Sequence, residues 1–454
     1  MDDREVQAKA LCSELGQEQL WAAYERLETT EEKKAFLDSL FKFDQNQLKA
    51  LEQQVKNAKE EQKDEGEVGY EPPDFVVKKQ MTEEEKAALD VTGRIAIAQG
   101  KLAVVTMAGG QGTRLGHDGP KGTYFIKNDG MDKSIFQILT EIMKKGRKTY
   151  QVDIPWYIMT SEENHEDTVR FFRENDCFGY PKGAIMFFRQ AKLPMFDEEG
   201  KILVGEDKQI KQAADGHGGV FDALRNSGCI KDMKRRGVEW IFVTGVDNII
   251  VEPIDPTFVG LAIENNVLAA GKSVVKARPE EKVGMYCKKN GETTVIEYSE
   301  ISPEMASERN PDGTLKYNQS HILNNMFNIQ VMNALATQKL PVHLAHKKAN
   351  YLDENGELVE ATEPNAYKCE KFMFDVFHIL KGVADKYNTL QQNARSGKGE
   401  KVRRELKDFI IMEVEREQEF APVKNATGVD SPETASELYR KKQEKLQSKD
   451  KEER

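Results

Sequence analysis

A short apolar run that ends in a cluster of glycines constrains the fold of this 454-residue chain more than any other feature. The run spans Leu102–Met107, and its length and apolar character predict a strand buried on both faces of a parallel sheet. Glycines in the following loop let backbone N–H groups approach a ligand closely, which is how a loop binds phosphate oxygens. Arg114 and Lys121 add positive charge beside those groups. The stretch therefore predicts a nucleoside triphosphate site.

Three other phosphate-binding loops do not fit this sequence. A Walker A loop needs Gly, four residues and then Gly-Lys-Ser/Thr, and this spacing does not occur in the chain. The dinucleotide fingerprint is G-x-G-x-x-G, whereas the spacing from Gly110 is G-x-G-x-x-x-G. The V-A-I-K, H-R-D and D-F-G motifs that follow a kinase glycine loop are missing. An ordinary tight strand-to-helix loop remains an alternative, although Arg114 and Pro120-Lys121-Gly122 favour phosphate binding.

Apolar strands alternate with helical stretches after residue 102. Further strands are expected at 154–159, 184–188 and 240–243, with an amphipathic helix at 163–175. This alternation predicts a mostly parallel sheet with helices on both faces. Ligands of such sheets bind beyond the carboxyl ends of the strands. That rule selects four places: the loop 109–122, Gln190, the loop 215–219 and the pair Asp247-Asn248.

Asp247 is a candidate ligand for a magnesium ion. It follows a buried apolar strand, and Mg²⁺ prefers hard oxygen ligands while keeping several waters. The alternative is a loop aspartate that hydrogen-bonds its own backbone.

The N-terminal segment predicts helices, with capping boxes at Thr29/Glu32 and Thr82/Glu85. The second box opens a helix expected to run to Gln99. Between them, the polar and Pro/Gly-punctuated stretch 62–73 predicts a linker. Asn290-Gly291 predicts a type I′ hairpin. After Ser431 we expect a helix and then a solvated, charged tail.

Composition limits the function classes. The chain has 66 Lys and Arg against 77 Asp and Glu, a net charge of −11, which argues against non-specific binding to nucleic acid or to an anionic membrane. No apolar run approaches the length of a membrane-spanning helix, and the N-terminus lacks the apolar region of a secretory signal. Five scattered cysteines predict free thiols in a reducing compartment, so we expect a cytoplasmic protein.

The glycine-rich loop resembles the signature of the eukaryotic-type UDP-N-acetylhexosamine (UDP-N-acetylglucosamine) pyrophosphorylases, through A-G-G-Q-G-T-R-L-G at 108–116 and P-K-G at 120–122. Further matches extend from about residue 80 to 432. They are V-D-N at 246–248, V-I-E-Y-S-E-I-S at 295–302, I-L-N-N-M-F at 322–327, P-N-A-Y-K-C-E-K-F-M-F-D at 364–375 and R-E-Q-E-F-A-P-V-K-N at 416–425.

The resemblance implies roles for individual residues. Those implied in nucleotide binding are Met107, Ala108, Gly109, Gly110, Lys121, Gln190, Gly216, Asp247 and Lys368. Those implied in sugar binding are His217, Gly284, Glu297, Tyr298, Asn324, Phe372, Phe374 and Lys424. The implied catalytic residues are Arg114, Lys121 and Lys424, and the implied metal ligand is Asp247. For the two phenylalanines, core packing is an equally good interpretation.

One position departs from the family pattern. His217 stands in D-G-H-G-G, where the family has D-G-N-G-G, and the UDP-glucose and broad-specificity UDP-sugar enzymes have G-H-G. Either side chain donates a hydrogen bond to a sugar hydroxyl. The choice of sugar therefore stays open, although the match around Asn324 favours the N-acetylhexosamine branch.

The resemblance also implies a fold and a reaction. The fold is α/β: a Rossmann-like (GT-A-type), mixed and mostly parallel nucleotidyltransferase core, with an N-terminal helical region and a small C-terminal domain. The corresponding domains are 1–95, 96–345 and 346–454. The reaction transfers uridylyl from UTP to N-acetylglucosamine 1-phosphate, with Mg²⁺ or Mn²⁺ as cofactor. We expect these small-molecule substrates, no nucleic-acid or membrane partner, and a monomer or weak homo-oligomer. A nucleotide-sugar-binding protein without catalysis is the alternative from another class.

Overall fold

The computed structural model describes residues 2–58, 69–128, 130–394 and 404–452. Contacts divide the chain into two compact units. Unit 1 combines Met1–Val68, Ala191–Gly219 and Lys339–Met373, and unit 2 combines Gly69–Gln190, Val220–Gln338 and Phe374–Arg454. Each unit thus draws on segments far apart in the sequence. The three consecutive domains expected above remain a prediction.

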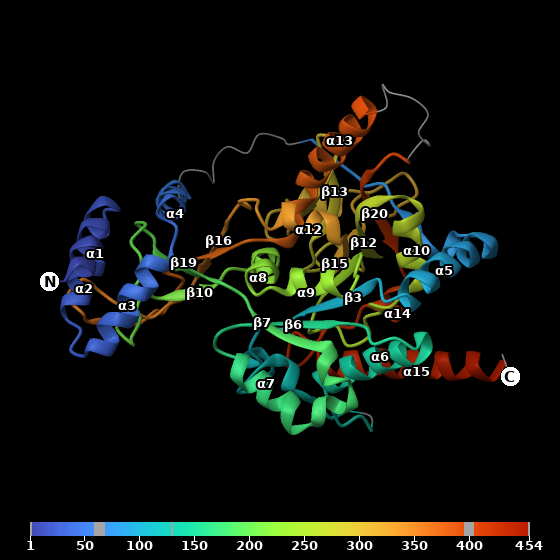
Figure 1. Ribbon diagram of the computed structural model, residues 1–454, viewed down its shortest axis with the longest axis horizontal. Helices are drawn as coiled ribbons and strands as arrows, with labels where there is room; N and C mark the ends of the chain where they lie inside the picture. Colours follow the sequence, from blue (N-terminus) through green and yellow to red (C-terminus); the bar gives the residue numbers. More distant parts are fainter. Residues whose placement is uncertain (1, 59–68, 129, 395–403, 453–454) are drawn as a thin grey trace. The chain divides into compact units, whose positions relative to one another are not determined.

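One large mixed sheet forms the centre of unit 2 (Figure 1). Its strand order is β2 (Val76–Val77), β20 (Lys407–Glu413), β12 (Val267–Val275), β15 (Gln319–Asn328), β11 (Trp240–Gly245), β3 (Leu102–Met107), β6 (Trp156–Thr160) and β7 (Ile185–Arg189). The last four strands are parallel to one another, whereas β15 is antiparallel to both of its neighbours, β11 and β12. β1 (Tyr70–Glu71), β13 (Met285–Lys289) and β14 (Glu292–Ile296) extend the sheet, and β4 (Phe125–Ile126) pairs separately with β5 (Lys133–Ser134). The predicted mostly parallel α/β fold is confirmed.

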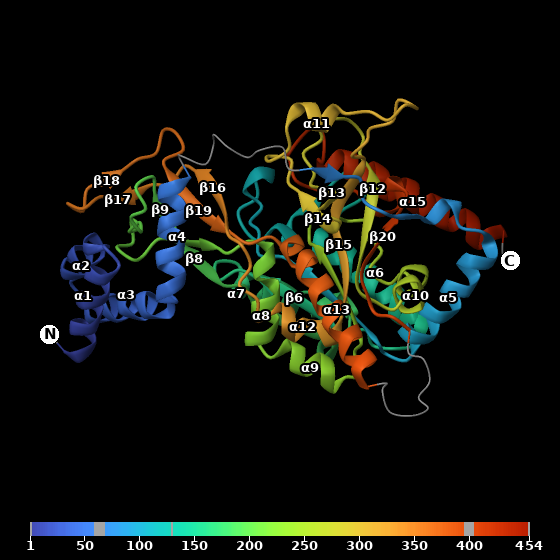
Figure 2. The same cartoon turned by 90° about the horizontal axis from the view of Figure 1, so that it is seen from above.

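Helices cover both faces of this sheet because its central strands are apolar on both sides; every residue of β3 is buried. One face packs on α5 (Glu83–Ala98), α6 (Ile135–Tyr150), α10 (Pro256–Glu264) and α15 (Pro432–Glu452). The other carries α8 (Val220–Asn226), α9 (Cys229–Arg235) and α12 (Ile329–Leu335), and Figure 2 shows α9 and α15 on opposite sides. The Tyr157 hydroxyl donates to Asp232 of α9 at 2.8 Å, and the Phe221 and Phe327 rings meet at 5.3 Å. The remaining helices of unit 2 are α7 (His165–Glu174), α11 (Pro303–Ser307), α13 (Phe377–Ala394) and α14 (Arg416–Glu419).

The C-terminal helix α15 confirms the helix expected after Ser431 and continues it to Glu452. Its first half has a buried face. Ala435 and Lys442 are 1% and 6% exposed, and Leu438 and Tyr439 pack on the core. These positions have the spacing of one helix face. The many charged residues between them make this apolar face difficult to recognise from the sequence.

Unit 1 joins the N-terminal helices to two inserted segments. The helices are α1 (Asp3–Glu14), α2 (Glu18–Glu25), α3 (Thr30–Lys42) and α4 (Gln45–Asn57). The strands are β8 (Lys192–Pro194), β9 (Phe196–Asp197), β10 (Gln212–Ala214), β16 (His343–Lys347), β17 (Tyr351–Leu352), β18 (Leu358–Val359) and β19 (Ala366–Glu370). The buried Gln17 side chain donates to the Gly200 carbonyl at 2.9 Å and accepts from the Ile202 amide at 2.7 Å. Together with a shared apolar core, this contact fixes the helices to the first insertion.

Local sequence signals behave as predicted. Both capping boxes form, with the Thr29 hydroxyl accepting from the Glu32 amide and the Thr82 hydroxyl from the Glu85 amide. The hairpin β13–β14 turns at Asn290-Gly291, where both residues have the positive φ that a type I′ turn requires. Residues 62–68 of the predicted linker lie outside the described residues. Among the helices that the structure describes, none combines the length and apolar character needed to cross a bilayer.

Candidate active site

The glycine-rich loop after β3 folds back on itself. The Lys121 amide donates to the Gly110 carbonyl at 3.0 Å, and the Gly112 amide donates to the Gly119 carbonyl at 2.9 Å. These contacts bring the two ends of the predicted phosphate loop together. The Lys121 side chain is half-buried, whereas Arg114 is exposed on the 3-10 turn Thr113–Leu115.

A residue that the sequence analysis missed holds this loop. Asn164 is fully buried, and its Nδ2 donates to the Ala108 carbonyl at 2.9 Å. Its Oδ1 accepts from the Ser161 amide at 2.8 Å, just after β6. Asn164 therefore fixes the start of the phosphate loop against the neighbouring strand. The rule that selected residues after strand ends could have found it, because β6 ends at Thr160.

Gln190 lies against the same loop. It follows β7, and its backbone amide donates to the Thr160 carbonyl at 2.9 Å. A Cβ on Gly109 would lie 2.4 Å from Gln190 Oε1, so the amide side chain sits directly on the loop backbone. A side chain at residue 109 would therefore displace the end of Gln190, and the structure brings together two of the predicted nucleotide-binding residues.

The end of β11 brings Asp247 next to the segment that carries Lys424. The Val246 amide donates to the Met107 carbonyl at 3.0 Å, and the Val423 amide donates to the Asp247 carbonyl at 2.9 Å. The Lys424 ammonium lies 3.7 Å from Asp430. Burial raises the pKa of the Asp430 carboxyl, and Lys424 opposes this rise. Asp247 and Lys424, far apart in the sequence, are therefore neighbours at the carboxyl edge of the sheet, beside the end of β3.

Asn324 is a fully buried polar side chain of β15. Its Oδ1 accepts from the Thr244 hydroxyl at 2.8 Å, whereas its Nδ2 has no hydrogen-bond partner among the described residues. Leu323 has a φ of 57°, and the pairing of β15 with β12 shifts register beside it. This β-bulge places Asn324 near the end of β11, and bulges of this kind often re-aim a side chain next to a site.

The other predicted sugar contacts in unit 2 differ in exposure. A Cβ on Gly284 would lie 3.2 Å from Glu297 Oε1, so Glu297 folds over Gly284 just after β14. Tyr298 is exposed, and Phe374 is buried, with its ring edge-on to His321 at 5.8 Å. Core packing therefore accounts for the position of Phe374.

Four predicted residues belong to unit 1: Gly216, His217, Lys368 and Phe372. The loop 215–219 pairs with the end of β19, because the Gly218 amide donates to the Lys371 carbonyl at 2.8 Å. A Cβ on Gly216 would lie 2.4 Å from that same carbonyl oxygen, so this glycine permits the close approach. Lys368 forms an ion pair with Glu370 of its own strand.

His217 has a defined orientation within unit 1. Its Nδ1 accepts from the Met373 amide at 2.9 Å, and its ring stacks on Phe372 at 5.3 Å. Because Nδ1 accepts, the neutral ring carries its proton on Nε2. His217 can therefore donate a hydrogen bond through Nε2, as an asparagine can through its side-chain amide.

The acidic residues allow a test of the predicted metal site. Mg²⁺ is usually held by one or two carboxylates together with substrate phosphates, and Asp247 at the strand end fits that mode. The described residues contain one group of three carboxylates close enough to hold an ion, formed by Glu252, Asp255 and Glu419. Lys272 Nζ already lies 2.9 Å from Asp255 and 2.6 Å from Glu419, so an ammonium occupies the place between two of these three carboxylates.

Comparisons with known proteins identify the family of this chain. The model of the UDPGP family, described as UTP–glucose-1-phosphate uridylyltransferase, matches residues 42–454. "UDP-N-acetylhexosamine pyrophosphorylase-like protein 1" of Xenopus tropicalis is 34% identical over 440 residues, covering 93% of this chain and 80% of the relative. The chain spans 64% of the human relative of that name.

Two further relatives carry a more specific name. "UDP-N-acetylglucosamine pyrophosphorylase" of Saccharomyces cerevisiae is 37% identical over 359 residues, covering 77% of this chain and 70% of the relative. The solved uridine diphosphate N-acetylglucosamine pyrophosphorylase of Trypanosoma brucei has a TM-score of 0.78 at 26% identity, covering 96% of this chain and 84% of that one. The resemblance seen in the motifs is confirmed, and the chain belongs to the UDPGP family of uridylyltransferases and, within it, to the UDP-N-acetylhexosamine pyrophosphorylases.

Proposed function

We propose that this protein transfers the uridylyl group of UTP to N-acetylglucosamine 1-phosphate and releases pyrophosphate, reversibly and with a divalent cation. The observation that carries the proposal is the placement of Asp247 and Lys424 side by side at the sheet edge where the glycine-rich loop begins. An acidic group for a metal and a cation for a second phosphate are what the joining of two anions requires.

The proposed mechanism depends on positioning and charge neutralisation. An oxygen of the sugar phosphate attacks the α-phosphorus of UTP, and the bond to the pyrophosphate oxygen breaks. No general base is needed, because the attacking phosphate is already ionised. The loop amides, Arg114 and Lys121 bind the triphosphate, and Lys424 neutralises the attacking phosphate. A magnesium ion held by Asp247 would supply further neutralisation of phosphate charge when bound.

The remaining predicted residues select the substrates. We assign Gln190 to uracil, because a carboxamide both donates and accepts. Glu297, Tyr298 and Asn324 are assigned to the sugar. The Nδ2 of Asn324 has no hydrogen-bond partner among the described residues, and this supports the assignment because an unpaired buried donor is costly. Within unit 1, we assign Gly216 and Lys368 to the nucleotide, and His217 and Phe372 to the sugar. The buried, free cysteines among the described residues support a cytoplasmic location.

The test is pyrophosphate release from UTP and Mg²⁺ with several sugar 1-phosphates. We expect N-acetylglucosamine 1-phosphate to be the best acceptor. Binding of a UDP-sugar without any pyrophosphate release would show a binding protein and refute the enzymatic proposal.

His217 supports a second candidate, a UDP-glucose or broad-specificity UDP-sugar pyrophosphorylase. We expect His217→Asn to change the ratio of kcat/KM between glucose 1-phosphate and N-acetylglucosamine 1-phosphate towards the latter. An unchanged ratio would remove His217 from sugar selection.

A further inference from the structure

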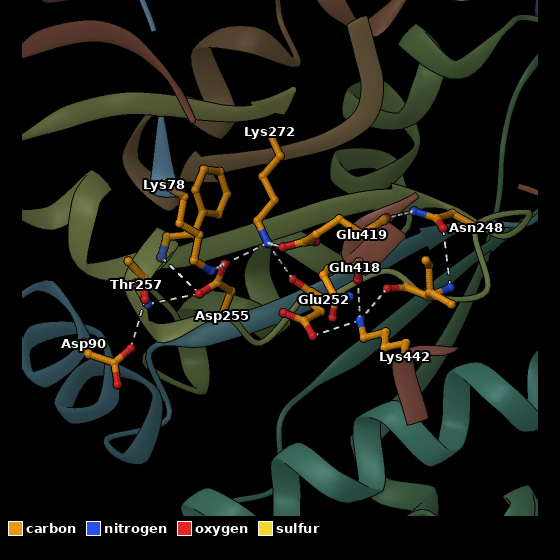
Figure 3. Close-up of polar contacts among 12 residues, drawn as sticks. Lys78, Asp90, Asn248, Glu252, Asp255, Thr257, Lys272, Gln418, Glu419 and Lys442 are labelled. Atoms are coloured by element: carbon orange, nitrogen blue, oxygen red, sulfur yellow. Dashed lines mark hydrogen bonds and ion pairs between the residues drawn. The ribbon is translucent and has the colours of Figure 1, made fainter. Parts of the chain in front are cut away.

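A cluster of lysines and carboxylates lies within unit 2, and Figure 3 shows its polar contacts. At its centre is Lys272 of β12, which is 0% exposed. Its Nζ contacts Asp255 Oδ2 at 2.9 Å, Glu419 Oε1 at 2.6 Å and the Glu252 carbonyl at 3.1 Å. Burial alone would lower the pKa of Lys272, but Asp255 and Glu419 outweigh burial and raise it. Lys272 is therefore a buried ammonium ion that joins distant segments.

The cluster has balanced charge. Lys78 pairs with Asp255 at 2.8 Å, and Lys442 of α15 pairs with Glu252 at 2.8 Å. Three lysines thus meet three carboxylates. Glu419 Oε2 has no hydrogen-bond partner among the described residues, so the pair with Lys272 satisfies that carboxylate only in part. A partly satisfied buried ion pair adds little stability over an apolar contact, which favours a role in fixing geometry.

The cluster holds the short segment that leads to Lys424. At Glu419 the side chain is bound by Lys272, and the backbone carbonyl accepts from Asn248 Nδ2 at 2.7 Å. Asn248 Oδ1 then accepts from the Ala421 amide at 3.0 Å. Lys442 donates to the Gln418 carbonyl at 2.6 Å. The segment 418–421 is therefore held by three side chains, those of Lys272, Asn248 and Lys442.

Asn248 links this fixed segment to the site itself. It follows Asp247 in sequence, and it is 3% exposed. Two residues beyond Ala421, the Val423 amide donates to the Asp247 carbonyl. The position of Lys424 relative to Asp247 is thus set by contacts on the backbone of 419–423, while the Lys424 side chain stays partly exposed.

We propose that Asn248, together with the Lys272–Glu419 pair, is a clamp that positions Lys424 against Asp247 for the second phosphate. This inference rests on the proposed function for the role of Lys424. Asn248, Lys272 and Glu419 are positioning residues, since their contacts are made to the protein.

The test compares Asn248→Ala with Asn265→Ala in the full chain. Asn265 is a matched control, because its side chain also donates to a backbone carbonyl, that of Leu261, but lies outside the clamp. Hydrogen exchange should accelerate about tenfold or more at the Ala421 and Val423 amides of Asn248→Ala. Exchange in β11 should stay unchanged, and Asn265→Ala should match the wild type in both regions.

Kinetics provide the second readout. In Asn248→Ala, KM for the sugar 1-phosphate should rise about tenfold, while the Kd for UTP with Mg²⁺ stays within about twofold of wild type. Glu419→Gln keeps an oxygen facing Lys272 and should retain the wild-type KM, whereas Glu419→Ala should raise it.

The two proposals fail in different ways. Unchanged exchange at 421–423 in Asn248→Ala, or an equal rise of KM in Asn265→Ala, would overturn the clamp. A wild-type protein without pyrophosphate release would overturn the proposed function, and the exchange measurement would still decide whether the clamp exists.

Discussion

Replacing Lys424 by alanine separates its proposed role in phosphate binding from its contribution to folding. The ammonium lies 3.7 Å from Asp430, and the two side chains are 31% and 28% exposed. It also lies 5.6 Å from the centre of the Phe420 ring. The backbone amide of residue 424, which donates to the Asp430 carbonyl, is unaffected by the substitution.

The expected loss of stability is small. A long ion pair near the surface contributes about 0–1 kcal/mol, and an exposed cation–π contact about 0.5–1 kcal/mol. Asp430 loses its counter-ion but can take up a proton more easily than usual, because burial already raises its pKa. We therefore expect the free energy of unfolding to fall by about 0.5–2 kcal/mol.

The expected loss of activity is larger. A hydrogen bond from an ammonium to a phosphate contributes about 1.5–3 kcal/mol, which corresponds to a factor of about 10–150 in kcat/KM for the sugar 1-phosphate. The Kd for UTP in the absence of sugar phosphate should not change, because Lys424 is assigned to the second phosphate.

The assay is pyrophosphate release at subsaturating sugar 1-phosphate, with UTP binding measured by calorimetry and stability by urea unfolding. A decrease of kcat/KM by less than about threefold would remove Lys424 from the mechanism. Weakened UTP binding of the same size would show that the substitution disturbs the whole site rather than the second phosphate.

Three further changes test other parts of the site. Arg114→Ala should lower kcat about 100-fold or more. The free energy of unfolding should stay within about 0.5 kcal/mol of wild type, because the side chain is exposed. A near-normal kcat would exclude Arg114 from charge stabilisation. Gly109→Ala should raise KM for UTP about tenfold, because the new Cβ would displace the end of the Gln190 side chain, and unchanged UTP binding would show that Gln190 does not contact the base. Asp255→Asn should destabilise the protein most above about pH 5, with the difference from wild type shrinking below about pH 4. The reason is that Lys272 and Lys78 outweigh burial and hold the folded pKa of Asp255 below its ordinary 3.8, so its contribution is lost as pH falls; a pH-independent difference in urea unfolding would refute this.

Features set by neighbouring residues could be predicted from the sequence. The strand at 102–107 and its glycine loop were predicted because burial on both faces leaves a continuous apolar run. The capping boxes and the Asn290-Gly291 turn formed as predicted because each depends on contacts within four residues.

Features that depend on tertiary contacts could not be predicted in this way. Lys272 stands in the run Val267–Val275, and a lysine in such a strand suggests an edge or an exposed face rather than full burial. Its counter-ions come from a loop and from α14, far away in the sequence. The composition of unit 1 also depends on tertiary contacts, because its core joins the N-terminal helices to segments beginning at 191 and 339.

The rule that ligands bind beyond strand ends found some of the site residues without the family resemblance. It selected Gln190, which directly follows β7, and Asp247, which lies two residues after β11. It could not select Asn324, which lies inside the antiparallel strand β15. Asn324 reaches the end of β11 through a bulge at Leu323, and a leucine with positive φ has no sequence signal, because side chains other than glycine and asparagine rarely adopt it. The strained backbone at this point lies next to a buried donor that has no hydrogen-bond partner among the described residues, and both features support the proposed contact of Asn324 with the sugar.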